Sequence, residues 1–358
     1  MRRTGFAMAL AVALIAAPAT AAAEQFGAVT RYLEDGYRSL GLPGASLLVV
    51  KDGKTAYERH FGAYTAETVV PIASASKWLS AAVVMTLVDE GRLDLDAPIS
   101  TYLPQFTGKK GEMTIRQMFA HTSGLIEPPS DGTRWNYDIT MAEYADRMAR
   151  DGVMAGDPGT GVRYASASMQ AVGAVAEKVT GKSWNELFRE RIGIPCDMPD
   201  TTYVRTPGTA PPATMNEPTR NPMVAAGARS SMRDYGHFLE MIANGGVYKG
   251  RRVISERSVR EMQKDQTGHL PLLRASNDRL GRESHYGLGQ WIDVQAPDGR
   301  TIQVSSPGAW GFRPWLNLDR GVYGVFVMQR KVGGPVVSAT FDPWKLIDLV
   351  HEAAADAR

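Results

Sequence analysis

One short segment of the sequence combines a serine and a lysine at a spacing that suits nucleophilic catalysis. In Ser74-Ala75-Ser76-Lys77 the lysine follows the serine by three residues, so both side chains share one face if the segment is helical. Ser74 would stand at the helix start, where backbone N–H groups and the helix dipole favour negative charge. The following residues are apolar, which disfavours an ammonium ion and favours a basic, uncharged lysine. The segment predicts a nucleophile, Ser74, activated by Lys77.

A plain structural interpretation fits the same four residues. Ser74 would cap a helix and Lys77 would lie in solvent, and a Ser-x-x-Lys spacing arises about once by chance in a chain of this size. Further segments must therefore decide between the two interpretations. They follow in this order: Gly91-Arg92-Leu93-Asp94-Leu95-Asp96-Ala97-Pro98-Ile99, Thr114-Ile115-Arg116-Gln117-Met118, His121-Thr122-Ser123-Gly124-Leu125, Tyr164-Ala165-Ser166 and Val172 to Gly181.

This ordered set resembles the serine β-lactamase and penicillin-binding-protein superfamily. The most similar branch holds class C β-lactamases, D-alanyl-D-alanine carboxypeptidases and family VIII carboxylesterases. The resemblance extends over roughly Gly41 to Trp344. It implies that Ser74 is the nucleophile, Lys77 its activating partner and Tyr164 a proton relay between the serine and the leaving group.

Two of the three active-site elements of that superfamily are altered here. The second element, Tyr-x-Asn in many members, reads Tyr164-Ala165-Ser166 and lacks the asparagine. The third, usually Lys-Thr-Gly or His-x-Gly, aligns with Ser306-Pro307-Gly308 and lacks the basic residue. The resemblance implies that the backbone N–H groups of Ser74 and Ala309 form the oxyanion hole. The residues expected in substrate binding are Ser166, Ser306, Gly308, Trp310 and Arg313.

The missing basic residue decides the expected substrate. Losing a charge-assisted contact to a substrate carboxylate costs about 1.5–3 kcal/mol, whereas an uncharged ester needs no such contact. We therefore expect a carboxylesterase-like hydrolase that forms an acyl-enzyme on Ser74 without a cofactor. A β-lactamase or D,D-carboxypeptidase is the alternative, with Arg313 restoring the charge, and a transacylase is a third. An alternative of another class is a catalytically quiet protein that binds penicillins or peptides.

The elements that must position these residues indicate an α/β fold of the α+β type. A helix over 29–40 precedes a hairpin over 45–62 that turns at Asp52-Gly53. A helix over 74–91 is apolar on nearly every face and must be buried. Strands are expected over 286–294, 300–304 and 321–330, and a last helix begins at Pro343. The pattern predicts one antiparallel sheet built from both ends of the chain and flanked by helices.

The middle of the chain indicates helical patches between Pro- and Gly-rich loops. Helices are expected over 139–148, 168–180, 183–191 and 234–243, with a loop over 206–222 and no clear strand between about 100 and 265. A mostly helical subdomain inserted into the sheet is therefore predicted. Residues 24–358 would form a single domain, with the sheet part at about 24–70 and 285–358 and the helical part at about 71–284.

The N-terminal 23 residues have the pattern of a secretory signal. Arg2 and Arg3 precede an apolar run of about 12 residues and the small residues Ala21-Ala22-Ala23. That run is short of the roughly 20 residues that span a bilayer. We expect cleavage after Ala23, no stable membrane anchor afterwards, and a periplasmic or secreted protein.

Charge and cysteine content exclude further classes of function. Of 40 basic residues, 38 remain without Arg2 and Arg3, equal to the 38 acidic ones, so nucleic acid is not an expected partner. Cys196 is the only cysteine, which leaves no internal disulfide, and we interpret it as a structural thiol. The six histidines show no metal-ligand spacing, so a small ester or amide is the expected partner and no metal is implied.

Overall fold

The structure is a computed structural model that describes residues 25–128, 136–205, 217–274, 285–329 and 341–355. The predicted signal segment lies outside these residues. No described helix is long and apolar enough to cross a membrane.

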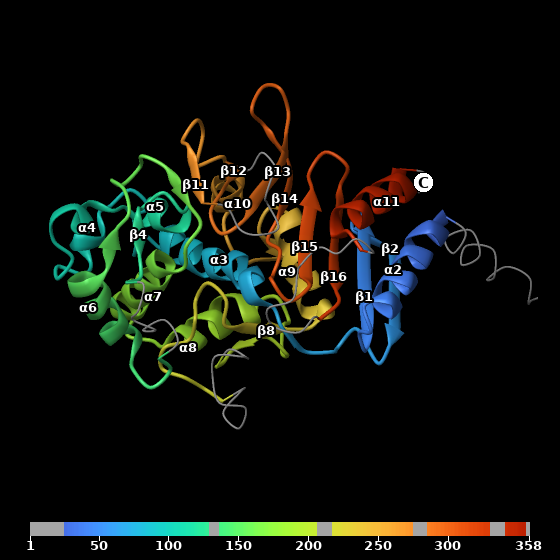
Figure 1. Cartoon of the computed structure of the whole chain (residues 1–358), viewed down its shortest axis with the longest axis horizontal. Helices are drawn as coiled ribbons and strands as arrows, with labels where there is room; N and C mark the ends of the chain where they lie inside the picture. The colour runs from blue at the N-terminus through green and yellow to red at the C-terminus, as the bar shows by residue number, and fades with distance from the viewer. Residues whose placement is uncertain (1–24, 129–135, 206–216, 275–284, 330–340, 356–358) are drawn as a thin grey trace, which may run out of the picture.

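A seven-stranded antiparallel sheet forms the right-hand half of the molecule in Figure 1. Its order is β12-β13-β14-β15-β16-β1-β2, so the N-terminal hairpin joins the sheet beside the last strand. This confirms the predicted sheet built from both ends of the chain. The strands are β1 (Gly44–Lys51), β2 (Lys54–Gly62), β12 (His285–Tyr286), β13 (Trp291–Gln295), β14 (Thr301–Ser305), β15 (Phe312–Asn317) and β16 (Val322–Val327).

The two faces of the sheet pack against different helices. Helices α2 (Gly27–Ser39) and α11 (Pro343–Ala355) cover one face around Trp315 and Phe326. Helix α9 (Met232–Ala243) covers the other face, where the ring of Tyr235 packs 5.2 Å from that of Phe312. Because side chains alternate along a strand, neighbouring residues of β15 point to opposite faces.

The helical half, on the left of Figure 1, contains the other elements. Its helices are α3 (Ser76–Asp89), α4 (Gly108–Glu112), α5 (Ile115–Phe119), α6 (Met141–Asp151), α7 (Ala167–Thr180), α8 (Trp184–Phe188) and α10 (Glu256–Gln263), with short 3₁₀ turns at Ala73–Ala75 and Ile99–Thr101 and a π turn at Arg189–Gly193. Helix α3 is buried on nearly all sides, as its composition predicts. The predicted helices of the middle region are thus confirmed to within a few residues.

The structure corrects the expectation that the middle region holds no strand. Among the described residues, nine short strands, seven of them between residues 100 and 265, pair as small ladders rather than extending the main sheet. They are β3 (Val70–Pro71), β4 (Leu125–Ile126), β5 (Val153–Met154), β6 (Val162–Arg163), β7 (Thr202–Tyr203), β8 (Ala228–Ser230), β9 (Val247–Tyr248), β10 (Arg251–Arg252) and β11 (Leu272–Arg274). Two or three residues are too few to show alternation in a sequence.

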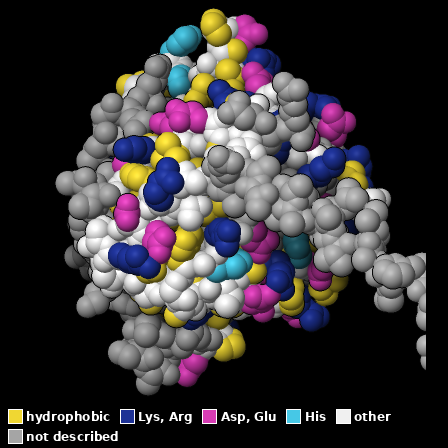
Figure 2. All heavy atoms as spheres, turned by 90° about the vertical axis from the view of Figure 1, so that its right-hand side faces the viewer, with side chains coloured by type: hydrophobic (Ala, Val, Ile, Leu, Met, Phe, Trp, Pro, Cys, Tyr) yellow, Lys and Arg dark blue, Asp and Glu magenta, His cyan; other side chains and the backbone are white. Residues whose placement is uncertain are grey.

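Two features of the structure concern its charge distribution and its cysteine. On the end of the molecule that faces the viewer in Figure 2, basic and acidic side chains are interspersed, without a large patch of one sign. Cys196 is fully buried, and burial raises the pKa of its thiol to about 12. Such a thiol is not a nucleophile near neutral pH.

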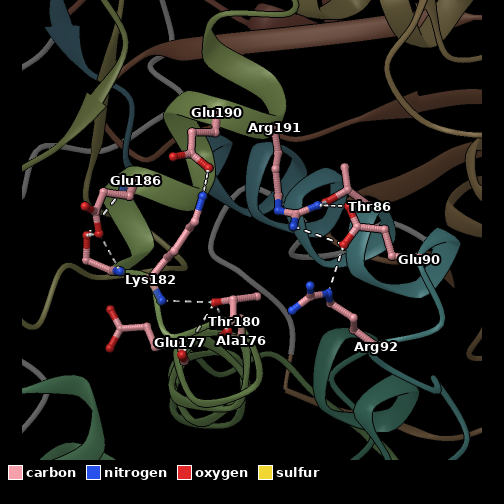
Figure 3. Close-up of polar contacts among 11 residues, drawn as sticks. Thr86, Glu90, Arg92, Ala176, Glu177, Thr180, Lys182, Glu186, Glu190 and Arg191 are labelled. Carbon is pink, nitrogen blue, oxygen red and sulfur yellow. Dashed lines mark hydrogen bonds and ion pairs between the residues drawn. The ribbon is translucent and has the colours of Figure 1, made fainter.

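A half-buried carboxyl in the helical half makes the stability of the fold depend on pH. Burial is the main cause that raises the pKa of Glu177, on α7, to about 7, although its carboxylate accepts the backbone N–H of Trp184 at 2.8 Å. Figure 3 shows Glu177 near the turn that carries Lys182 and Glu186. A raised carboxyl pKa means that the folded state binds more protons, so stability falls as pH rises from about 4.5 to 7.

We expect Glu177→Gln to flatten that dependence. Since the glutamine stays neutral, it should remove a pH-dependent loss on the order of 3 kcal/mol across this range. Urea unfolding at pH 5 and pH 7.5 measures the change. Glu190→Gln is the control, because Glu190 forms an ion pair with Lys182 nearby. It should leave the change of stability with pH as it is in the parent protein. An unaltered slope in Glu177→Gln would contradict the assignment.

Candidate active site

Ser74 lies in the 3₁₀ turn that leads into α3, and the backbone on both sides of it is held firmly. The hydroxyl of Ser306 donates to the Ser74 carbonyl at 3.2 Å. Tyr235 donates to the Ala75 carbonyl at 2.8 Å, and Ser76 donates to the Ala73 carbonyl at 2.7 Å. These bonds come from β14–β15, α9 and α3, so the position of Ser74 is set by three parts of the fold.

The residue before Ser74 has an unusual backbone. Ala73 has φ +46°, a region that costs a non-glycine residue about 1–2 kcal/mol. The backbone N–H of Ile72 donates to the Ala228 carbonyl at 3.0 Å, so the entry to the turn is fixed to β8. The unusual backbone next to Ser74 is therefore maintained by tertiary contacts.

Lys77 reaches Ser74 as the spacing predicts. Its Nζ lies 3.1 Å from Ser74 Oγ and donates to the Ala225 carbonyl at 3.0 Å, and the residue is 1% exposed. The solvated lysine of the plain structural interpretation is therefore wrong. The buried amine lies within hydrogen-bond distance of the serine hydroxyl, so a proton can pass between them.

The Ala225 carbonyl is held by a buried amide on α7. Gln170 Nε2 donates to Asn221 Oδ1 at 2.7 Å and to the Pro222 carbonyl at 2.8 Å, and its Oε1 accepts the N–H of Val224 at 2.9 Å. The Gln170 side chain thus holds residues 221–224, which lead to the Ala225 carbonyl that Lys77 contacts.

The second element brings Tyr164 to the same place. Lys77 Nζ lies 4.7 Å from the centre of the Tyr164 ring, which stacks on Trp291 at 5.2 Å. Ser166 follows at the start of α7, where it is the N-cap residue without a side-chain cap bond. Ser74, Lys77 and Tyr164, which lie up to 90 residues apart in sequence, therefore form one cluster.

The third motif, Ser306-Pro307-Gly308, lies directly against the turn that contains Ser74. A side chain on Gly308 would place its Cβ 2.0 Å from the Ile72 carbonyl oxygen, so only glycine fits. Gly308 also bridges to Phe312 of β15, and Ala309 and Trp310 follow in an exposed and a half-buried position. This contact brings the Ala309 segment alongside the turn of Ser74, as the expected oxyanion hole requires.

Arg313, which was expected to bind substrate, packs against α11 in the structure. It pairs in register with Phe326, and its guanidinium lies 4.9 Å from the Trp344 ring of α11. These contacts lie on the sheet face covered by α2 and α11, whereas Phe312 faces α9. The alternation of β15 therefore turns Arg313 away from Ser74.

The structure adds residues that the sequence-based prediction did not place in the site. They are His121, Ala225, Gly289 and Trp291. His121 belongs to the His-Thr-Ser-Gly-Leu segment, whose position in the ordered motifs was a signal. Nothing in the sequence distinguishes Ala225, since it contributes only a carbonyl.

Gly289 has a positive φ of +76°, and an added Cβ would lie 2.4 Å from the Lys77 carbonyl oxygen. We expect Gly289→Ala to destabilise the fold by about 1–3 kcal/mol and to lower turnover at least tenfold, because α3 must shift. Gly299→Ala is the matched control, since Gly299 has φ +84° and nothing within 4 Å of an added Cβ. Thermal unfolding and ester turnover measure both variants. Equal effects at the two glycines would contradict the close contact with Lys77.

Comparison with known proteins identifies the group to which the chain belongs. Residues 27–345 match the model of the Beta-lactamase family. D-alanyl-D-alanine-carboxypeptidase/endopeptidase AmpH of Escherichia coli K12 is 24% identical over 341 residues, which cover 86% of this chain and 82% of AmpH. Protein flp of Staphylococcus aureus MW2 is 29% identical over 187 residues, so the match spans 46% of this chain but only 36% of that longer protein.

Solved structures share the fold across nearly the whole chain. A Bacteroides dorei DSM 17855 protein assigned as a β-lactamase has a TM-score of 0.81 at 29% identity, over 92% of this chain and 99% of that one. A family VIII carboxylesterase has a TM-score of 0.71 at 18% identity, over 92% and 97% of the two chains. Taken with the Ser74–Lys77 contact, the family match shows that this protein is a serine hydrolase of the β-lactamase family.

Proposed function

We propose that the protein is an exported carboxylesterase-like hydrolase that acts on small, uncharged esters through an acyl-enzyme on Ser74. The observation that carries the proposal is the third element. Ser306 replaces a basic residue there, is 3% exposed, and donates to the backbone carbonyls of Ser74 and Gly289. With Arg313 on the other face of the sheet, neither residue offers a positive charge to a substrate carboxylate.

In the proposed reaction each side chain has one role. Lys77 takes the hydroxyl proton as Ser74 Oγ bonds to the ester carbonyl carbon, and the backbone N–H groups of Ser74 and Ala309 stabilise the oxyanion. The C–O bond to the alcohol then breaks while Tyr164 donates a proton to the leaving oxygen and Lys77 returns its proton to Tyr164. Water attacks the acyl-enzyme, releases the acid and restores Ser74.

A second candidate, a peptidase for substrates that carry a carboxylate, is favoured by two arginines beside the second element. Arg163 and Arg274 are register partners on β6 and β11, and the N–H of Tyr164 donates to the Arg274 carbonyl at 2.9 Å. Arg163 Nε is buried without a hydrogen-bond partner among the described residues. Arginine is well suited to bind a carboxylate, and the relative AmpH is a D-alanyl-D-alanine carboxypeptidase/endopeptidase by name.

Matched substrates separate the two candidates. The two test substrates are N-acyl-D-alanyl esters of a hydroxy acid, one with the carboxyl of the hydroxy acid blocked and one with it free. We expect the blocked ester to be hydrolysed at least tenfold faster than the ester with the free carboxylate. The reverse order, abolished by Arg163→Met but not by the exposed control Arg59→Met, would favour the peptidase. Covalent capture of nitrocefin with slow release and no ester turnover would instead identify the quiet binding protein.

Export is part of the proposal because the signal pattern of residues 1–23 supports it. We expect the full-length gene product expressed in a Gram-negative host to appear outside the cytoplasm with Glu24 as its N-terminal residue. Cell fractionation and intact mass measure both. A cytoplasmic product that retains Met1 to Ala23 would contradict the proposal.

A further inference from the structure

His121 is a buried histidine in contact with the candidate proton relay. It follows α5, is 2% exposed, and has a φ of +62°. Its ring centre lies 4.4 Å from that of Tyr164 and 4.6 Å from that of Tyr286. Positive φ is rare outside glycine and costs about 1–2 kcal/mol, so the fold holds this ring in place at an energetic cost.

Two hydrogen bonds attach His121 to the residues on either side of Tyr164. The N–H of Arg163 donates to the His121 carbonyl at 2.8 Å, and the N–H of Ala165 donates to Nδ1 at 3.4 Å. The ring packs against the tyrosine between them. One residue therefore contacts the backbone before Tyr164, the backbone after it and the ring itself.

The two ring nitrogens of His121 indicate that its role is more than to fill space. Because Nδ1 accepts the Ala165 N–H, the neutral ring carries its proton on Nε2. Nε2 is buried and has no hydrogen-bond partner among the described residues, which costs about 1–3 kcal/mol. An apolar side chain of similar size would avoid that cost but could not accept the Ala165 N–H.

The ring is also uncharged. Burial is the main cause that lowers the pKa of His121 well below its usual range, and the nearby Lys77 lowers it further. A charged ring would repel a protonated Lys77, so a neutral acceptor is compatible with a lysine that gains and loses a proton.

We propose that His121 is the positioning residue of Tyr164: its carbonyl, its Nδ1 and its ring hold the tyrosine where it can pass a proton to the leaving group. The inference rests on the proposed function, in which Tyr164 donates that proton. His121 touches no substrate in this account and acts only through Tyr164.

The dependence of rate on the leaving group tests this role. A p-nitrophenolate ion leaves readily without a proton, whereas an alkoxide needs one. We expect His121→Ala to lower kcat for an ethyl ester about 100-fold and for the p-nitrophenyl ester of the same acid less than tenfold, with KM unchanged within threefold. His121→Asn tolerates the positive φ and offers an amide oxygen to the Ala165 N–H, so it should restore most of the ethyl ester rate.

Tyr164→Phe makes the result interpretable. It should show the same difference between the two esters, and the double variant should be no slower than Tyr164→Phe alone. Equal losses on both esters in His121→Ala, or additive losses in the double variant, would overturn the positioning role while leaving the function of Tyr164 intact. If Tyr164→Phe shows no difference between the esters, the proposed function fails and this inference fails with it. If His121→Ala does not fold, His121→Gln gives the same readout, because its longer amide is displaced from the Ala165 N–H.

Discussion

Ser74→Ala is expected to lower kcat for esters by on the order of 10⁴-fold or more while the protein stays folded. The size of the effect follows from the role of Ser74 Oγ, because no acyl-enzyme forms without it. Only substrate binding and the N–H groups of the oxyanion hole then remain to assist the reaction. The backbone at Ser74 is held by bonds to its own carbonyl and to that of Ala75. These bonds do not involve the lost hydroxyl, so the turn should keep its shape.

Two measurements check this expectation. Initial rates on p-nitrophenyl acetate give the loss of turnover, and intact mass after rapid acid quenching shows whether an acyl group is retained. Ser306→Ala is the matched control, because it removes a buried hydroxyl that bonds the same turn without removing the nucleophile. It should lower stability by about 1–3 kcal/mol yet still acylate. Acylation that persists in Ser74→Ala would refute the mechanism.

Lys77→Met is expected to lower kcat/KM for esters by about 10²- to 10⁴-fold, the usual contribution of a general base. Lys77 Nζ lies 3.1 Å from Ser74 Oγ and is buried beside Tyr164, so no water can replace it easily. Methionine fills a similar volume and leaves no polar amine to be buried, so it avoids the cost of desolvating that group. Activity should therefore fall while the melting temperature stays the same or rises.

Lys77→Arg separates a base from a fixed charge. A guanidinium stays protonated in proteins, so it supplies positive charge but cannot accept the serine proton. We expect Lys77→Arg to be as inactive as Lys77→Met in steady-state ester turnover. Near-UV circular dichroism provides the check that the larger side chain has not displaced α3. Substantial turnover by a folded Lys77→Arg would show that Lys77 acts through its charge alone.

The local spacing of Ser74 and Lys77 predicted that their side chains meet, and the further motifs predicted their roles as nucleophile and base. Ser74 and Lys77 are three residues apart on a helical segment, so helix geometry alone brings them together, and the structure confirms the contact. The apolar, β-rich run at 45–51 and the Asp52-Gly53 turn likewise predicted the hairpin that the sheet contains. Features that depend on a few neighbouring residues can be derived from those residues.

Features that depend on distant contacts could not be derived in this way. The strand β15 was not predicted, and its alternation places Arg313 against Trp344 instead of near Ser74. The Ala225 carbonyl reaches Lys77 only because Gln170 holds the segment before it. Short ladders such as β6 with β11 have too few residues to show a period.

The sequence by itself thus predicted Ser74 as the nucleophile, the general architecture and the absence of a basic residue at Ser306. Only the tertiary structure decided which groups lie around Ser74. Arg313 packs against Trp344 on the sheet face that α11 covers. Gly289 contacts the backbone of Lys77, and the ring of His121 packs against that of Tyr164. The physical reason is that helix and turn geometry is local, whereas the side to which a strand residue points depends on register and packing across the whole sheet.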